Sequence, residues 1–405
     1  MIVESWAACT ADVRQAGGGS AGARAWPRRA VGVYDGGAAG TRGGGARAFA
    51  FAVAARHHLR GARRTEWERP VGGPRFGLEL HEYLDAPTVL REAQQAEALG
   101  YASVWLADSQ LIWRELYVLL GAVAATTSRV ALGTGVTNPV TRHAAVTAGA
   151  ITTLQELARG RAILGIGLGN TSLATLGRPP ATRAALADYV ATVRALCAGE
   201  IVAGAGGALR LAFGAPDRCP PVVIAGSGPK ILGLAGAIGD GVIIAGRGRV
   251  GPTLAAMLEH VRAGRAASGR LDRPFTTYLG VAVAVHADRA KAIGAVRPHV
   301  VGSALRRPLW PLSPAAQAAS ERVQAVYSPY DHMSPTDKYA GLVPDEVVTE
   351  FAIAGTPADC RAQAEALFAA GVDEITIRPY AVDGAPRSAT TERFAREVMA
   401  PLLGG

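Results

Sequence analysis

The stretch RVALGTGVTNPVTRHAAVTAGAITTLQELARGRAILGIGLGN, Arg129–Asn170, decides the fold. Its first part, Val130–Val136, is a run of β-branched residues and glycines that is typical of a strand buried on both faces. Pro139 ends this strand, because a proline nitrogen has no hydrogen to donate to a sheet. The stretch therefore begins with a buried strand and a break.

The rest of the stretch predicts a helix over residues 143–157 and a second buried strand. Apolar and small residues recur on one helical face, namely Thr147, Ile151, Leu154 and Ala158. Gly160 is typical of a helix C-cap, and Ala162–Ile166 is again fully apolar. Two parallel strands joined by a helix form a right-handed βαβ unit. Polar and glycine residues follow each strand, where parallel α/β folds place their sites.

The same alternation of strands and helices extends on both sides of this unit. Eight strands are predicted, at 75–80, 102–107, 130–136, 162–166, 220–228, 241–245, 276–285 and 372–379. Their number, with helices between them, predicts an α/β fold of the (β/α)8 barrel type. An open doubly wound sheet is the alternative, but no GxGxxG motif follows the first strand.

One segment interrupts the alternation after the seventh predicted strand. Residues 288–345 are proline-rich and too long for a bare loop, which predicts an insertion that caps the site end of the barrel. Its aromatic residues could line a pocket or pack the insertion onto the barrel; they are Trp310, Tyr327, Tyr330 and Tyr339.

Composition excludes several classes of protein. No apolar run reaches about 18 residues without glycine or charge, so we expect no membrane association. The four cysteines are scattered, without CxxC or histidine clustering, which argues against a metal site or a disulfide framework. This pattern is typical of a reducing compartment, and we expect a cytoplasmic protein.

The basic charge lies mostly at the amino-terminal end. The chain has 405 residues and a formal charge of +9, of which residues 1–74 carry +6, with eleven arginines, five acids and no lysine. The remaining charge is ordinary for an enzyme, so we expect no nucleic-acid partner. Residues 1–74 are biased to glycine, alanine and arginine and lack core-forming periodicity. They predict either a disordered arm or upstream sequence read from a start codon placed too early, with the barrel domain at 75–405.

Two motifs together carry a family resemblance. LGTGVTNPVTRHAAVTAGAITTLQELARGRAILGIGLGN, followed by VVIAGSGPKILGLAGAIGDGVI, resembles the bacterial luciferase-like monooxygenase superfamily over about residues 75–380. Within it, the chain is most similar to the branch that depends on the deazaflavin coenzyme F420 and includes methylenetetrahydromethanopterin reductase. The resemblance implies a TIM barrel that binds its flavin or deazaflavin at the carboxyl ends of the strands.

The sequence AGSGPK predicts a phosphate-binding loop. Gly226, Ser227 and Gly228 can turn backbone N–H groups toward a phosphate at the start of the next helix, and Lys230 can add a charge. A plain strand-to-helix turn is the alternative. If the loop binds phosphate, Gly226→Val is expected to weaken cofactor binding with little effect on thermal stability.

The resemblance also implies cofactor contacts around the third and fourth strands. It places a non-prolyl cis peptide bond beneath the central ring, at Gly135–Val136. Asn138, Gly167 and Asn170 follow these strands and are candidates for contact with the ring or its ribityl chain. For both asparagines, capping of loop backbone is the alternative.

Candidate catalytic residues follow the first and second strands. Glu79, Asp108 and Trp113 are expected to position the substrate and the ring, with Glu79 as a general acid. Packing against a helix is the alternative for Trp113. Relatives often have Asp-His where this chain has Asp108–Ser109, and some have Glu at the position of Asn170. Without that His and Glu, a sugar-phosphate dehydrogenase is not expected; Ser109 is retained as a cofactor contact.

These residues lead to one expected function and two alternatives. The expected function is a coenzyme F420-dependent oxidoreductase that transfers a hydride to or from a small organic substrate. The alternatives are an FMNH2-dependent monooxygenase on the same fold and a non-catalytic barrel that binds ligand. The resemblance implies a homodimer.

Overall fold

The computed structural model describes residues 73–80, 84–169, 171–204, 207–215, 219–245, 252–306, 308–326, 337–339 and 341–404. The expected arm 1–74 therefore lies almost wholly outside the described residues, as do Asn170, Tyr327 and Tyr330.

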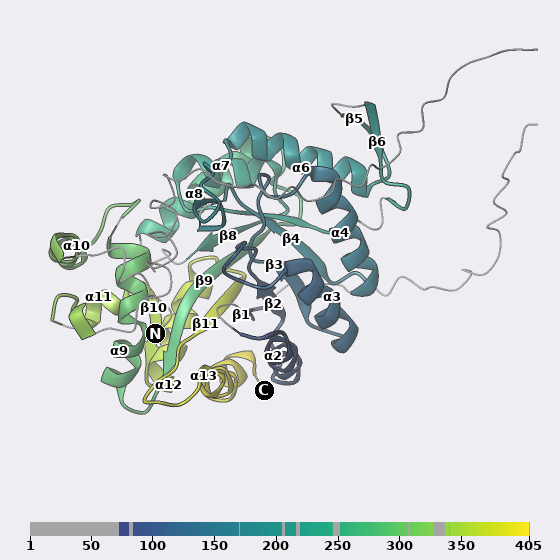
Figure 1. The fold of residues 1–405 in the computed structure, drawn as a ribbon. Coiled ribbons are helices and arrows are strands. Elements are labelled where there is room, and N and C mark those ends of the chain that lie inside the picture. The colour runs from purple at the N-terminus through teal and green to yellow at the C-terminus, as the bar shows by residue number, and fades with distance from the viewer. Residues whose placement is uncertain are drawn as a thin grey trace, which may run out of the picture. The chain divides into compact units, whose positions relative to one another are not determined.

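Eight parallel strands close into a barrel, which confirms the predicted fold (Figure 1). In barrel order they are β1 (Arg75–Leu80), β2 (Ser103–Leu106), β3 (Ala131–Thr134), β4 (Ala162–Ile166), β7 (Val222–Ala225), β8 (Gly241–Ala245), β9 (Thr276–Val285) and β11 (Glu374–Pro379). Pairing of β11 with β1 and of β8 with β9 closes the ring.

Helices cover the outside of the barrel. They are α2 (Ala86–Ala98), α3 (Leu116–Thr126), α4 (Ala144–Leu157), α5 (Thr171–Ala174), α6 (Arg183–Cys197), α7 (Pro229–Ile238), α8 (Pro252–Ala267), α12 (Pro357–Ala369), α13 (Arg387–Phe394) and α14 (Ala400–Leu403), with the π-helix η5 (Ala395–Met399). The predicted face of α4 is buried, since Thr147, Ile151, Leu154 and Ala158 are at most 2% exposed. His143 is its N-cap and accepts a hydrogen bond from the Ala145 N–H.

Two features of the fold differ from the prediction. The insertion predicted at 288–345 is largely helical rather than irregular: it holds α9 (Arg289–Val300), the π-helix η2 (Val301–Leu305), α10 (Pro314–Val326) and the 3-10 turn η4 (Asp337–Tyr339). The added elements continue beyond the predicted bounds with α11 (Asp345–Thr349) and a short strand β10 (Ala352–Gly355). The insertion's own apolar core contains Tyr339 and includes Ala282 and Ala284 of β9. A hairpin, β5 (Ile201–Gly204) and β6 (Gly207–Arg210), was not predicted and projects beside α6 (Figure 1).

The barrel has separate inner and outer packing layers. Trp105, Ala131, Ile163, Val223 and Tyr278 form the inner cluster, with Trp105 and Tyr278 in edge-to-face contact at 5.1 Å. The alternate residues of each strand pack outward against the helices, as the two-residue period of a strand requires. The inner cluster fills the barrel below the strand ends, and the candidate site lies at those ends.

Candidate active site

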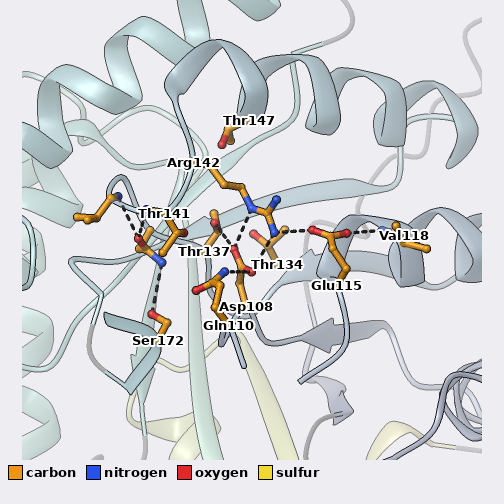
Figure 2. Close-up of polar contacts among 12 residues, drawn as sticks. Asp108, Gln110, Glu115, Val118, Thr134, Thr137, Thr141, Arg142, Thr147 and Ser172 are labelled. Carbon is orange, nitrogen blue, oxygen red and sulfur yellow. Dashed lines mark hydrogen bonds and ion pairs between the residues drawn. The ribbon is translucent and has the colours of Figure 1, made fainter. Parts of the chain in front are cut away.

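Asp108 follows β2 and is the centre of a polar network at the strand ends (Figure 2). Its side chain is 4% exposed. One carboxylate oxygen accepts hydrogen bonds from Thr137 Oγ1 at 2.7 Å and Arg142 Nε at 3.2 Å. The other accepts from Arg142 Nη2 at 3.1 Å and Gln110 Nε2 at 2.7 Å. The carboxylate is thus occupied by groups of the protein itself.

Arg142 joins three elements through this network. Besides Asp108, it donates to Glu115 Oε1 at 2.5 Å, and Glu115 in turn caps α3 by accepting from the Val118 N–H at 2.8 Å. The guanidinium lies 5.0 Å from the centre of the Tyr117 ring, an attractive cation–π distance. Burial disfavours the charged guanidinium, but the hydrogen bonds and charges of Asp108 and Glu115 outweigh it and raise the pKa of Arg142. Arg142 is not among the predicted site residues, so its contacts with Asp108 and Glu115 were missed.

The bulge after β3 has the conformation that the resemblance implied, since the Gly135–Val136 peptide bond is cis. The bulge is tied to both neighbouring strands: the Gly135 N–H donates to Leu106 O at 2.6 Å, and the Thr137 N–H donates to Gly165 O at 3.1 Å. The Gly167 N–H donates back to Thr137 O at 3.0 Å. Gly135, Val136 and Gly167 therefore lie together at the barrel mouth.

Glycines beneath the bulge make room for Trp105. A Cβ on Gly133 would lie 2.1 Å from the Trp105 ring, and one on Gly165 would lie 2.1 Å from Thr134 O and 3.2 Å from both Trp105 and Val136. Only glycine fits at these two positions. The indole thus packs under the bulge, a contact that the strand pattern of the sequence did not indicate.

Asn138 caps backbone, the alternative left open above. Its Oδ1 accepts hydrogen bonds from the N–H groups of Val140 and Thr141, both at 3.0 Å. Its Nδ2 donates to Ser172 Oγ at 3.4 Å, and the residue is 1% exposed. A contact between Asn138 and a cofactor stays a prediction.

The glycine loop is only partly suited to the predicted phosphate contact. The Gly226 N–H donates to Ile243 O at 3.1 Å, so it belongs to the sheet. A Cβ on Gly226 would lie 2.5 Å from Ile231 Cγ2. The expectation that Gly226→Val leaves stability unchanged is therefore wrong, because valine would collide with a β-branched side chain.

The start of α7 is better suited to an anion. Gly228 is the N-cap and supplies no side-chain hydrogen bond to the helix, and a Cβ there would meet no atom within 4 Å. Because Pro229 follows, the first backbone donors of the helix are the N–H groups of Lys230 and Ile231. The Lys230 side chain is exposed. Ser227 is held by the insertion, since Trp310 Nε1 donates to its carbonyl at 2.6 Å.

The other predicted site residues lie apart. Trp113 precedes α3 in a loop, because the helix begins at Leu116. Its side chain lines a small apolar crevice with Leu106 and Leu116, and its N–H donates to Ser109 O at 3.0 Å. A contact of Trp113 with a cofactor, and likewise one of Ser109, stays a prediction.

Glu79 lies at the end of β1 and is ion-paired with a residue that sequence reasoning missed. Arg378 of β11 donates to Glu79 Oε2 from Nη2 at 2.7 Å and from Nε at 3.1 Å. A signal was present in the sequence: the two-residue period of EITIRP puts Glu374, Thr376 and Arg378 on one strand face.

Comparison with known proteins shows which family the chain is similar to. A family model described as luciferase-like monooxygenase matches residues 73–374. The 5,10-methylenetetrahydromethanopterin reductase of Methanolobus tindarius is 30% identical, with 81% of this chain and 99% of that protein covered. The F420-dependent glucose-6-phosphate dehydrogenase of Kineococcus radiotolerans is also 30% identical, over 77% of this chain and 91% of that protein.

Solved structures share the fold. The coenzyme F420-dependent tetrahydromethanopterin reductase from Methanopyrus kandleri superposes with a TM-score of 0.69 at 22% identity, covering 82% of this chain and all of the other. An F420-dependent secondary alcohol dehydrogenase, in complex with an F420–acetone adduct, gives a TM-score of 0.62 at 20% identity, with 82% and 98% covered.

Proposed function

The chain belongs to the luciferase-like monooxygenase family, and from this membership and the strand-end geometry we propose that it is a coenzyme F420-dependent oxidoreductase. Two relatives that it matches over nearly their whole length are a 5,10-methylenetetrahydromethanopterin reductase and an F420-dependent glucose-6-phosphate dehydrogenase. The observation that carries the proposal is the packing of the Gly135–Val136 segment over Trp105, at the same barrel end as the start of α7, whose N-cap supplies no side-chain hydrogen bond.

The residues present fit a deazaflavin with a flat ring and a phosphodiester tail. The bulge at Gly135 and Val136 lies against Gly167 and offers a surface without large side chains to one face of a ring. The N–H groups of Lys230 and Ile231, with Ser227 and Gly228 before them, are placed to hold a phosphate. Bound there, a deazaflavin would supply hydride transfer.

The chain's own residues would bind, orient and move a proton. Glu79 is the candidate proton donor or acceptor, because its carboxylate lies on the inner strand face near the carboxyl end of β1. Asp108 would be a positioning residue, because its hydrogen bonds with Thr137 and Arg142 hold the segment that follows the bulge. Trp113, Ser109, Asn138 and Asn170 stay proposed contacts of the ring region.

The cellular location, the metal requirement and the oligomeric state of the protein are also proposals. No helix among the described residues is both long and apolar enough to cross a bilayer. Within the same residues no cluster of three metal-ligating side chains is found, and the three described cysteines are free. From family likeness we propose a cytoplasmic homodimer that needs no metal and acts on a small molecule.

Titration of the protein with oxidised F420 and, separately, with FMN tests the assignment. Quenching of tryptophan fluorescence should give micromolar or tighter affinity for F420 and much weaker affinity for FMN. Tight FMN binding with oxygen consumption on reduction, and no response to F420, would instead assign the chain to the monooxygenases. Binding of neither would support a barrel with another ligand.

A further inference from the structure

The β5–β6 hairpin leaves the barrel at the end of α6 and returns to the same point. Cys197 is the last residue of α6, and its carbonyl oxygen accepts a hydrogen bond from the Ala215 N–H at 2.8 Å. A Cβ on Gly199 would lie 2.6 Å from the carbonyl oxygen of Gly214. The chain that enters the hairpin and the chain that returns from it are therefore in close backbone contact at the end of α6.

Two cysteine side chains lie in contact at this point. The thiols of Cys197 and Cys219 are hydrogen-bonded to each other. The Cys197 sulfur also accepts a hydrogen bond from Thr152 Oγ1 of α4 at 3.3 Å and lies 3.9 Å from the carbonyl oxygen of Ala148. Cys197 is buried, whereas Cys219, which precedes β7, is half-buried. One sulfur is thus held in place by α4, and the other lies nearer the surface.

The hydrogen bond between the thiols makes the pair more acidic than an isolated thiol. It lowers the pKa of Cys197 to about 7, because the Cys219 S–H stabilises the Cys197 thiolate more than burial disfavours it. The same bond raises the pKa of Cys219, since the two sulfurs share the remaining proton. When that proton crosses to Cys197, the negative charge lies on Cys219. A thiolate, rather than a thiol, is the nucleophile in cysteine oxidation.

We propose that Cys197 and Cys219 are an oxidation site, at which hydrogen peroxide converts the two thiols to a disulfide that fastens the base of the β5–β6 hairpin. Metal binding is another common use of adjacent cysteines, but no group of three metal-ligating side chains occurs among the residues that the structure describes. A disulfide that forms and is reduced again is compatible with a reducing compartment, where such bonds are usually transient.

The oxidation balances with one molecule of peroxide. The Cys219 thiolate attacks one peroxide oxygen, the O–O bond breaks, and the hydroxide that leaves takes up the proton lost from the thiol to form water. Cys219 is then a sulfenic acid. The Cys197 sulfur attacks the Cys219 sulfur, the S–O bond breaks, and the Cys197 proton leaves with the oxygen as a second water. The two sulfurs lose two electrons, which reduce the peroxide.

Counting thiols after brief exposure to hydrogen peroxide gives the test. The protein is the full chain with Cys9→Ser, so that the remaining thiols are those of the three described cysteines. Peroxide should remove two of the three, and dithiothreitol should restore both. Cys360 should stay reduced, because burial raises its pKa to about 12. Mass spectrometry of the digested, unreduced protein should show the peptides that contain Cys197 and Cys219 joined to each other.

Two variants separate reaction of the pair from general oxidation. In Cys219→Ser, the rate at which peroxide removes thiols should fall about tenfold or more, since the hydrogen bond that favours the thiolate is lost. Cys360→Ser is the matched control and should lose two thiols at the unchanged rate. In the oxidised protein the thermal unfolding temperature should rise by about 5 °C, because the disulfide closes the loop between residues 197 and 219 in the unfolded chain.

Several results would overturn the proposal. They are retention of all three thiols, loss of Cys360 at the same rate as the other two, disulfides found only between chains, and an unchanged rate in Cys219→Ser. An oxidised protein that unfolds at the same or a lower temperature would show that the bond does not fasten the hairpin, and would overturn it equally. Should Cys219→Ser not fold, the peptide masses decide the question, because they require no change to the pair.

Discussion

At the scale of single residues, it was easier to predict which side chains lie at strand ends than to predict which residues pair with them. Asp108, Asn138 and Glu79 all lie at strand ends, as expected. Asp108, however, is bound by Arg142, which is 34 residues away along the chain, and Glu79 is bound by Arg378, 299 residues away. Side-chain pairing across strands depends on barrel closure, and a single sequence contains the pattern of each strand but not the closure itself.

The Asp108–Arg142 pair makes a prediction about stability. Arg142→Gln would leave a carboxylate that is 4% exposed without its cation, so unfolding free energy should fall by about 3 kcal/mol. Asp108→Asn combined with Arg142→Gln should be less destabilised than Arg142→Gln alone, because the buried carboxylate of Asp108 is no longer left unpaired and Glu115 is 45% exposed. Urea unfolding of the two single variants and the double variant measures the coupling. Additive losses would show that the pair does not act as a unit.

Substitution of Gly228 should change F420 affinity and the stability of the apo protein in opposite directions. Aspartate at this N-cap can accept hydrogen bonds from the first turn of α7, so Gly228→Asp should stabilise the apo protein by a few tenths of a kcal/mol. Its carboxylate would also occupy and repel the proposed phosphate position, so F420 affinity should fall at least about tenfold.

Gly228→Asn is the control for that variant. It caps the helix without a charge and should therefore weaken F420 binding less. Equal affinity of the aspartate variant and the wild type, in a fluorescence titration, would place the phosphate elsewhere.

At the scale of elements, the strands followed from the sequence because each buried strand is a short apolar run ended by glycine or polar residues. The eight predicted strands correspond to β1–β4, β7, β8, β9 and β11. The insertion was misread, since prolines at 298 and 314 suggested irregular chain. Pro298 lies inside α9 and Pro314 begins α10, where its missing N–H costs nothing. The hairpin β5–β6 was missed because its strands are only four residues long and largely exposed.

Glu97 connects α2 to the segment before β3 and predicts a pH dependence. Its carboxylate accepts hydrogen bonds from the N–H groups of Ser128, Arg129 and Val130. Burial disfavours the charged form, but these bonds outweigh it and lower the pKa of Glu97 below its usual 4.5. A lowered folded-state pKa stabilises the protein above the unfolded-state value, and this stabilisation is lost as pH falls through the folded-state pKa.

Glu97→Gln should therefore be less stable than the wild type by about 1–2 kcal/mol at pH 7. The difference should hold above about pH 5 and narrow as the pH falls toward and below 4, which unfolding by urea at several pH values can follow. If the difference in unfolding free energy between Glu97→Gln and the wild type did not change with pH, the loss would come from poorer hydrogen-bond geometry of the amide and not from the missing negative charge.

At the scale of the whole molecule, fold and family were predictable from the sequence, while the arrangement of the barrel mouth was not. The inner cluster of Trp105 and Tyr278 and the contact of Trp310 with the glycine loop join strands and insertion that are far apart in sequence. These contacts follow from the closed ring and the folded insertion, and no local pattern encodes them. The distribution of charge along the chain, in contrast, follows directly from the sequence.

Residues 1–72 carry +6 of the net charge of +9 and none of the motifs that define the family. The family match begins at residue 73, and every contact described for the barrel is made without the preceding segment. A chain that starts at Gly73 should therefore keep its thermal unfolding temperature within about 2 °C and its F420 affinity within about twofold, since the segment that matches the family is left whole. It should elute from a cation exchanger at clearly lower salt, because two thirds of the net positive charge is gone. Loss of folding or of F420 binding in the shortened chain, with the full chain as control, would show that the segment is part of the working enzyme.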